Sequence, residues 1–164
     1  MKSKDWLTAE EARRRLDYNP DTGRLTWKLM RNSLRIGEEA KCLDVSGYVQ
    51  VNICGTMVKG HRLAWLIHYG EWPSGDIDHI NGVRNDNRIW NLRVVTNAIN
   101  CQNKRTALPK SKTGVLGVVE VRGRYQANIH FNRKKRYLGT YDTAEQAHAV
   151  YVDAKRLLHE GCTL

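Results

Sequence analysis

Hydrophobic and polar positions in the first half of the chain follow two periods, one typical of helices and one typical of strands. Thr8-Ala9-Glu10-Glu11 forms a capping box, which predicts a short helix with Ala12 and Leu16 on its apolar face. Alternating positions predict short strands at 24–28, 47–53 and 57–59. The apolar stretch 61–69, closed by Gly70, predicts a second helix.

The second half shows a simpler order after a polar break at 108–114. Alternation predicts three strands, at 115–121, 124–131 and 135–141, joined by hairpin loops at 122–123 and 132–134. A capping box at 143–146 starts a helix that runs toward Gly161. Its apolar face has spacings of three and four and comprises Ala147, Val150, Tyr151, Ala154, Leu157 and Leu158. One helix can cover one face of a three-stranded sheet, so this half is predicted to be a βββα module.

The middle strand of that module separates two kinds of side chain. The residues expected to meet the helix are Tyr125, Ala127, Ile129 and Phe131. The residues expected to point outward are Arg124, Gln126, Asn128 and His130. A polar ribbon of this kind fits the major groove of DNA, although an ordinary solvated sheet face has the same pattern. The basic hairpin loops on either side favour DNA binding.

Charge strengthens the case for a polyanionic partner. The chain has 164 residues and a net charge of +10. Residues 101–136 hold ten Lys or Arg but a single acid, Glu120. This concentration favours binding to nucleic acid, but charge alone does not exclude a basic face that only keeps the protein soluble.

The sequence also bears on where in the cell the protein is found. No run approaches the roughly 20 apolar residues that span a bilayer, and the N-terminus leads into charged sequence. We therefore expect a cytoplasmic protein that is not secreted and has no membrane partner. The four cysteines include no C-x-x-C pair, which predicts buried or half-buried thiols and neither a zinc ribbon nor a disulfide framework.

The densest group of reactive side chains lies at 76–103 and is rich in Asp, Asn and His. Loops can absorb some of these residues, because short polar side chains favour turns. Thr96 can cap a helix that places Asn97, Asn100 and Asn103 on one face. Phosphodiester hydrolysis needs a base and a cation. A histidine suits the first role, and carboxylate and amide oxygens suit a hard ion such as Mg²⁺.

Several parts of this segment together resemble a known motif. Asp78-His79-Ile80-Asn81-Gly82, then residues 87–93 (Asn-Arg-Ile-Trp-Asn-Leu-Arg) and Asn100, look like the motif of HNH endonucleases, especially the phage and intron-encoded homing enzymes. Gly47-Tyr48-x-x-Val51 and His61-Arg62-Leu63-Ala64-Trp65 also resemble that family. The resemblance covers roughly residues 20–105. The combined motif is specific, whereas an isolated Asp-His pair is not.

This resemblance implies a ββα-metal (His-Me finger) fold whose helix begins near Asn97. It implies His79 as general base, and Asp78 and Asn100 as ligands of one divalent ion, Mg²⁺ or Mn²⁺. It also implies that Asn91 ties the hairpin loop and orients His79 through backbone contacts. Asn100 stands where other HNH proteins have a histidine, a replacement usual in this branch that argues against a zinc-type ligand set.

The C-terminal module, over roughly 113–161, resembles the APETALA/ethylene-response-factor DNA-binding domain. The resemblance rests on Gly117-Val118, Tyr125-x-Ala127-x-Ile129, residues 137–141 (Tyr-Leu-Gly-Thr-Tyr) and residues 143–147 (Thr-Ala-Glu-Gln-Ala). It implies DNA contacts by Asn128, His130, Lys135 and Tyr137, with Gln126 nearby. Val119 and Val121 stand where the plant family has arginines, so plant base specificity is not expected. Phage HNH nucleases often carry this module for targeting.

We therefore predict an α+β protein in three parts: a ββα-metal nuclease domain at 1–105 with its core motif at 76–103, a basic linker at 106–114, and a βββα DNA-binding domain at 115–164. The predicted DNA contacts are Lys104, Arg105, Arg122, Arg124, Gln126, Asn128, His130, Arg133, Lys135 and Tyr137. The expected activity is metal-dependent nicking or cleavage of double-stranded DNA by a monomer that needs no organic cofactor.

Two alternative functions stay open: a non-catalytic, sequence-specific DNA-binding regulator on a nuclease scaffold, and an RNA-binding protein. The presence of all four motif residues (Asp78, His79, Asn91 and Asn100) favours the enzyme. Some smaller roles are also open. His61 and Arg62 either approach substrate phosphates or start a helix, and Asp76 could be a second carboxylate at the metal. Core packing is preferred to base stacking for Trp65, Trp72 and Trp90.

Overall fold

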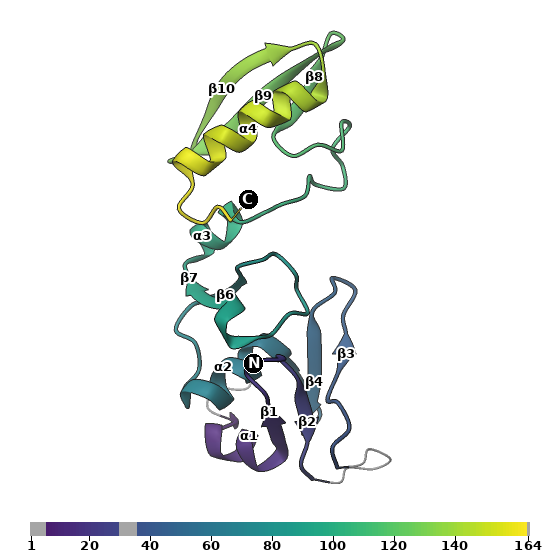
Figure 1. Ribbon diagram of the computed structural model, residues 1–164, viewed down its shortest axis with the longest axis vertical. Helices are drawn as coiled ribbons and strands as arrows, with labels where there is room; N and C mark the ends of the chain where they lie inside the picture. The colour runs from purple at the N-terminus through teal and green to yellow at the C-terminus, as the bar shows by residue number, and fades with distance from the viewer. Residues whose placement is uncertain (1–5, 30–35, 164) are drawn as a thin grey trace. The chain divides into compact units, whose positions relative to one another are not determined.

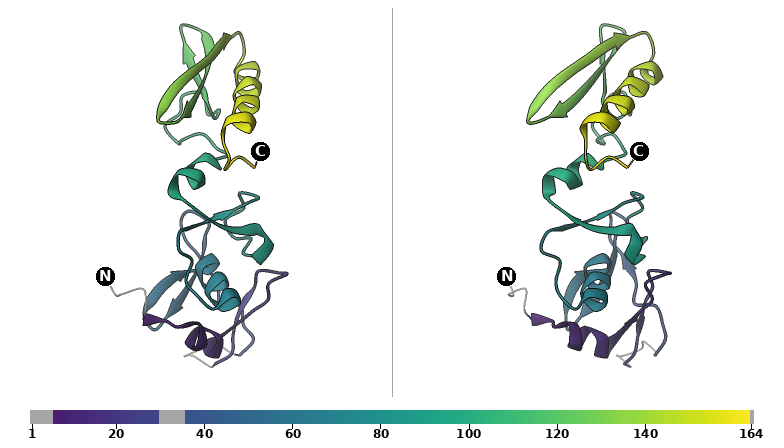
Figure 2. Two further views of the ribbon diagram at one scale, coloured as in Figure 1. Left: turned by 90° about the vertical axis from the view of Figure 1, so that its left-hand side faces the viewer. Right: turned by 60° about the vertical axis from the view of Figure 1, so that its left-hand side comes forward.

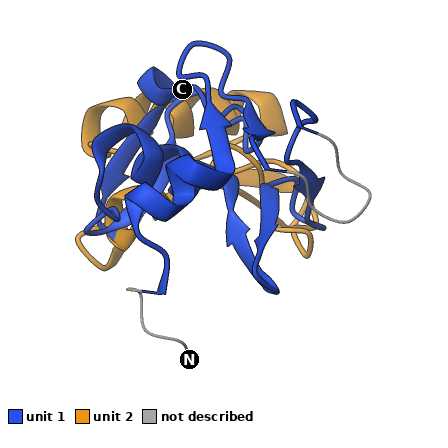
Figure 3. Cartoon of the chain, turned by 90° about the horizontal axis from the view of Figure 1, so that it is seen from below, with its two compact units in different colours: residues 1–96 blue, residues 97–164 orange. Residues whose placement is uncertain are grey.

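The computed structural model describes residues 6–29 and 36–163, which divide into two compact units, 1–96 and 97–164 (Figure 3). Both units mix helices and strands, which confirms the predicted α+β class. No helix in the described part of the chain is long and apolar enough to cross a membrane. Three cysteines, Cys42, Cys54 and Cys101, are exposed free thiols, so the expectation that these side chains are buried or half-buried was wrong.

The first unit begins with α1 (Ala9–Arg15), whose capping residue Thr8 accepts a hydrogen bond from the backbone N–H of Glu11 at 3.2 Å. The chain then turns directly into β1 (Leu16–Tyr18), which pairs antiparallel with β2 (Leu25–Trp27). Leu16 was predicted on the helix face, but it is the first residue of β1 and is buried there.

A three-stranded sheet and a helix follow. The strands are β3 (Cys42–Leu43), β4 (Val49–Ile53) and β5 (Thr56–Lys59), in the order β3-β4-β5. The alternation of β4 buries Val49, Val51 and Ile53, as its sequence predicts. Helix α2 (Gly60–Tyr69) ends at Gly70, which adopts the left-handed conformation expected of a helix-terminating glycine.

The last pair of strands in this unit is β6 (Asp76–His79) and β7 (Leu92–Val95), which run antiparallel. A 3-10 turn, η2 (Ile89–Asn91), leads into β7. The register places Asp78 opposite Arg93 and His79 opposite Leu92. One apolar core joins α1, α2 and these strands, with Leu16, Ile53, Leu63, Leu66, Ile77 and Leu92 among its buried members.

The second unit has α3 (Asn97–Gln102), then β8 (Val118–Val121), β9 (Arg124–Phe131) and β10 (Lys134–Tyr141), and finally α4 (Ala144–Leu158). The sheet order is β10-β9-β8, and α4 lies across one face of it (Figures 1 and 2). Thr143 and Gln146 form the predicted reciprocal capping box. The βββα arrangement is therefore confirmed.

Packing in this unit centres on Ala127, Ile129, Ala147 and Tyr151, from β9 and α4. Gly117 lies so close that a Cβ there would be 2.1 Å from the Tyr151 ring. Two details of the prediction were wrong. Leu157 is 86% exposed, whereas Ala154 and Leu158 of the predicted apolar face pack against the core. The second hairpin loop has two residues, Asn132 and Arg133, both with positive φ, and Lys134 already pairs in the sheet.

The segment that carries α3 is held by the C-terminal tail of the same unit. The Gly161 N–H donates to Oε1 of Gln102 at 3.0 Å, and Nη2 of Arg105 donates to the Thr163 carbonyl at 2.8 Å. The buried ammonium of Lys155 donates to the Lys104 carbonyl. The predicted linker, 106–114, consequently lies inside the second unit.

Candidate active site

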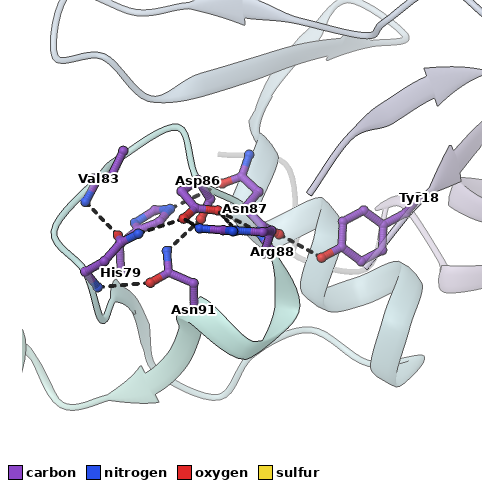
Figure 4. A network of polar contacts seen from close by, with 8 residues as sticks. Tyr18, His79, Val83, Asp86, Asn87, Arg88 and Asn91 are labelled. Carbon is purple, nitrogen blue, oxygen red and sulfur yellow. Dashed lines mark hydrogen bonds and ion pairs between the residues drawn. The ribbon is translucent and has the colours of Figure 1, made fainter. Parts of the chain in front are cut away.

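His79 is the last residue of β6, and its side chain is buried. Nε2 of His79 lies 3.2 Å from Oδ1 of Asn87 (Figure 4). A carboxamide oxygen only accepts hydrogen bonds, so this contact places the proton of the neutral ring on Nε2 and the lone pair on Nδ1. The Asn87 side chain therefore selects the tautomer of His79.

Asn87 is itself held firmly in place and is only 2% exposed. Its carbonyl accepts a hydrogen bond of 2.7 Å from the Tyr18 hydroxyl (Figure 4). Gly60 makes room for its carboxamide, because a Cβ there would lie 2.9 Å from Nδ2 of Asn87. The sequence placed Asn87 inside the HNH-like motif but assigned it no role. Its role becomes visible only from its burial, because a buried amide must find a hydrogen-bond partner and the sequence does not show burial.

Asn91 closes the loop between β6 and β7 and is fully buried. Its Nδ2 donates to the Asp86 carbonyl at 2.8 Å, and its Oδ1 accepts from the Asn81 N–H at 2.9 Å. The Asn91 carbonyl accepts from the Ile80 N–H at 2.9 Å, directly after His79. These contacts are of the kind expected for Asn91, while the direct contact with the His79 ring comes from Asn87.

Asp86 anchors the same loop through its carboxylate. Arg88 donates to Oδ1 at 2.7 Å through Nε, and Asn81 donates to Oδ2 at 2.6 Å through Nδ2. The hydrogen bond from Arg88 is the main reason that the pKa of Asp86 is lowered. Arg88 and Asn81 thus both hold the Asp86 carboxylate within the loop.

Asp78 precedes His79 and is also buried. Its Oδ2 accepts two hydrogen bonds from Arg93, from Nε at 2.9 Å and Nη2 at 2.7 Å, across the β6–β7 pair. A buried carboxylate of this kind is a suitable oxygen ligand for a hard divalent ion. Asn100 lies on α3 in the second unit, and its partnership with Asp78 stays a prediction. In residues 6–29 and 36–163, no cluster of three His, Cys, Asp or Glu side chains forms a potential metal site.

Two aromatic side chains border His79. The His61 ring, from the first turn of α2, meets it edge to face at 5.2 Å and 89°. The Tyr48 ring lies 5.8 Å from His79 and 5.5 Å from His61. His61 therefore packs against the candidate base, which favours the structural alternative for it. Arg62 donates to the Gly75 carbonyl at 3.4 Å and covers the Trp72 ring.

Burial controls the protonation of both histidines. It lowers the pKa of His61 to about 3, so this ring is neutral near pH 7. Burial also lowers the pKa of His79, while the hydrogen bond to Asn87 acts in the opposite direction. A neutral His79 at physiological pH can accept a proton from water, which is what a general base requires.

The tryptophans divide into two groups. Trp65 and Trp72 are partly buried against the core of the first unit, as predicted. Trp90 is 59% exposed, so the core role predicted for it was wrong. Asn91, the next residue on η2, takes the buried position, and the guanidinium of Arg88 lies 4.1 Å from the Trp90 ring. Asp76 begins β6 at intermediate exposure.

Most of the residues predicted to contact DNA are accessible. The exposed ones are Lys104, Arg105, Arg122, Arg124, His130, Arg133, Lys135 and Tyr137. Gln126 is half-buried, and Asn128 is only 9% exposed, opposite Tyr137 in the sheet register. Arg124 forms an ion pair with Asp142 at 2.9 Å. The outward face of β9 is therefore less open at its centre than the sequence suggested.

The comparisons with known proteins bear on the later part of the first unit and on the whole of α3. No curated protein and no solved structure matches the chain. A family model described as HNH endonuclease matches residues 58–102, a shorter span than the 20–105 expected from the sequence. That span contains Asp78, His79, Asn87 and Asn91, the residues of the site. This part of the chain is similar to HNH endonucleases, and this similarity supports a nuclease activity.

Proposed function

We propose that this protein is a divalent-metal-dependent endonuclease of double-stranded DNA with His79 as its general base. The observation that carries the proposal is the contact between Nε2 of His79 and Oδ1 of Asn87, and the buried Asp78 is the residue that precedes His79 in β6. This arrangement lies in the segment that matches the HNH endonuclease model, and HNH endonucleases act on DNA.

The proposed chemistry follows from the residues. The lone pair of His79 takes a proton from the attacking water, while Asn87 holds the opposite nitrogen. Asp78 and Asn100 are the proposed ligands of one Mg²⁺ or Mn²⁺ ion, and they offer the oxygen atoms that such ions prefer. When bound, the ion would stabilise the charge of the phosphorane and of the departing 3′ oxygen. Arg93 holds the Asp78 carboxylate in position.

The second unit is proposed to supply affinity for the duplex. Its exposed basic residues include Arg133 and Lys135 in the β9–β10 hairpin and Arg122 in the turn between β8 and β9. Contacts of this kind with phosphates bind DNA of any sequence and weaken with salt. One catalytic histidine in each chain favours nicking by a monomer.

The decisive experiment is cleavage of a supercoiled plasmid with Mg²⁺, in which nicked circles are the expected product. The His79→Ala variant should lose this activity. His68→Ala is the matched control, because His68 is an exposed histidine on α2 of the same unit. Undiminished cleavage by His79→Ala, or cleavage that persists in excess chelator, would contradict the mechanism.

The alternative is a DNA-binding regulator that keeps a nuclease scaffold. The exposed basic face of the second unit is the observation in its favour. This alternative requires that the wild-type protein shift duplex DNA in a gel while leaving the plasmid intact with both Mg²⁺ and Mn²⁺. A nicked product that depends on His79 excludes it.

A further inference from the structure

Two loops of the first unit meet beside His79. The first, residues 44–48, is capped by Asp44, whose Oδ1 accepts from the N–H groups of Ser46 at 2.8 Å and Tyr48 at 2.9 Å. The second is the loop between β6 and β7, which contains Arg84. Nη1 of Arg84 donates to the Ser46 carbonyl at 2.8 Å and so ties the second loop to the first.

The Tyr48 ring links this junction to the candidate base. The guanidinium carbon of Arg84 lies 5.2 Å from its centroid, and the His79 ring lies 5.8 Å from it. Arg84 and His79 are therefore neighbours of the same aromatic ring. The positive charge of Arg84 also contributes to the lowered pKa of His79, after burial as the main cause.

The guanidinium of Arg84 is held in place and still has donors to spare. Arginine carries five N–H donors, and the Ser46 carbonyl takes one of them. No other hydrogen bond or ion pair of Arg84 occurs among the described residues, and the side chain is exposed. A rigid guanidinium with open donors matches the two-oxygen geometry of a phosphate group.

Lys59 is the other cation at this ring, 5.2 Å from its centroid, but its ammonium is paired with Asp44. The Asp44 carboxylate thus offsets Lys59 while its other oxygen caps the loop. The cation at this ring that no acidic side chain in the described part of the chain offsets is Arg84. A polyanion that approaches His79 would meet that charge.

We propose that Arg84 binds a backbone phosphate of the DNA beside His79, with Tyr48 as the residue that positions its guanidinium. The inference rests on the proposed function and adds a phosphate contact made by the nuclease unit itself. Because the guanidinium is already ordered by Ser46 and Tyr48, little side-chain freedom is lost when the phosphate binds.

The test is the salt dependence of binding to a short DNA duplex, measured by fluorescence anisotropy without divalent metal. All proteins carry His79→Ala, so that no cleavage interferes. Arg84→Gln should weaken binding about tenfold and reduce the slope of log K against log[salt] by about one, the amount expected for one lost phosphate contact. Arg14→Gln is the control, because Arg14 is an exposed arginine on α1 paired with Glu11.

Two further variants examine the positioning role of Tyr48. Tyr48→Phe keeps the ring and should preserve the slope, whereas Tyr48→Leu removes the ring and should weaken binding. Arg84→Lys keeps the charge but loses the two-donor geometry, so its slope should match the parent while its affinity falls. Circular dichroism melting of each variant checks that it folds.

The outcomes separate the two proposals. A slope unchanged by Arg84→Gln overturns the phosphate contact, even if affinity falls. If the wild-type protein nicks plasmid and the slope is unchanged, this inference fails alone. If the slope falls as expected but the wild-type protein never cleaves, the phosphate contact stands and the proposed nuclease activity fails.

Discussion

His79 and Asn87 lie eight positions apart in the sequence, yet their side chains meet through Nε2 and Oδ1 at 3.2 Å in the buried centre of the candidate site. This contact gives the candidate base a defined orientation and tautomer. The Tyr18 hydroxyl donates to the backbone carbonyl of Asn87, and Gly60 leaves space for the Asn87 carboxamide.

Asn87→Leu should lower the rate of plasmid nicking about 10- to 100-fold, the usual effect of removing the group that orients a catalytic or metal-bound imidazole. Single-turnover cleavage at saturating DNA measures this. Tyr18→Phe is the control, since it keeps the Asn87 carboxamide and should cost about 1 kcal/mol of stability with little change in rate. Equal rates for Asn87→Leu and wild type would show that Asn87 does not orient His79 for catalysis.

His61 should make the first unit sensitive to acid. Its folded pKa of about 3 lies below the unfolded value near 6.5, so the unfolded chain binds the extra proton first. Stability is therefore full above about pH 6.5 and declines as pH falls toward 3, by at most about 1.4 kcal/mol per pH unit from this group. Urea unfolding at several pH values measures the slope. His61→Phe should flatten it, and an equally steep profile in that variant would contradict the assignment.

Arg93→Met should destabilise the first unit by about 1–3 kcal/mol, because it takes the guanidinium away from the buried Asp78 carboxylate. Cleavage should fall as well, since Asp78 loses the group that orients it. Arg24→Met is the matched control. Arg24 is exposed and lies 4.0 Å from Glu39, so its loss should change stability by less than about 1 kcal/mol. Denaturant unfolding and plasmid nicking are the two measurements, and similar losses in both variants would count against the role of Arg93.

Gly117→Ala should destabilise the second unit by about 2–4 kcal/mol and weaken DNA binding. The added Cβ would lie 2.1 Å from the Tyr151 ring, at a backbone φ of +79° that favours glycine. Gly114→Ala separates the two effects, because Gly114 has a φ of +66° but nothing within 4 Å of the added carbon. That variant should lose only about 1 kcal/mol. Thermal unfolding distinguishes them, and equal losses would mean that the clash with Tyr151 is relieved elsewhere.

Several elements could be predicted because their signals are local. The alternation of residues 124–131 matches β9 throughout, and the capping box at Thr143 marks the start of α4. The strand at Leu16 was missed because residues 9–16 keep a helical spacing, and only pairing with β2 turns Leu16 into a strand residue. Leu157 was misplaced because helical periodicity does not separate it from its neighbour Leu158, which packs against the core while Leu157 is exposed.

The order of residues alone identifies which chemistry is present: a carboxylate, an imidazole and several amides in one short segment, with basic residues concentrated after it. It could not decide which amide faces His79, because that depends on how the β6–β7 loop folds around Asn91. It also could not show that Tyr48 and His61 both contact the His79 ring, because Tyr48 lies just before β4 and His61 lies on α2. Spacing along a chain reports on local conformation, whereas contacts between elements are decided by how their buried faces pack.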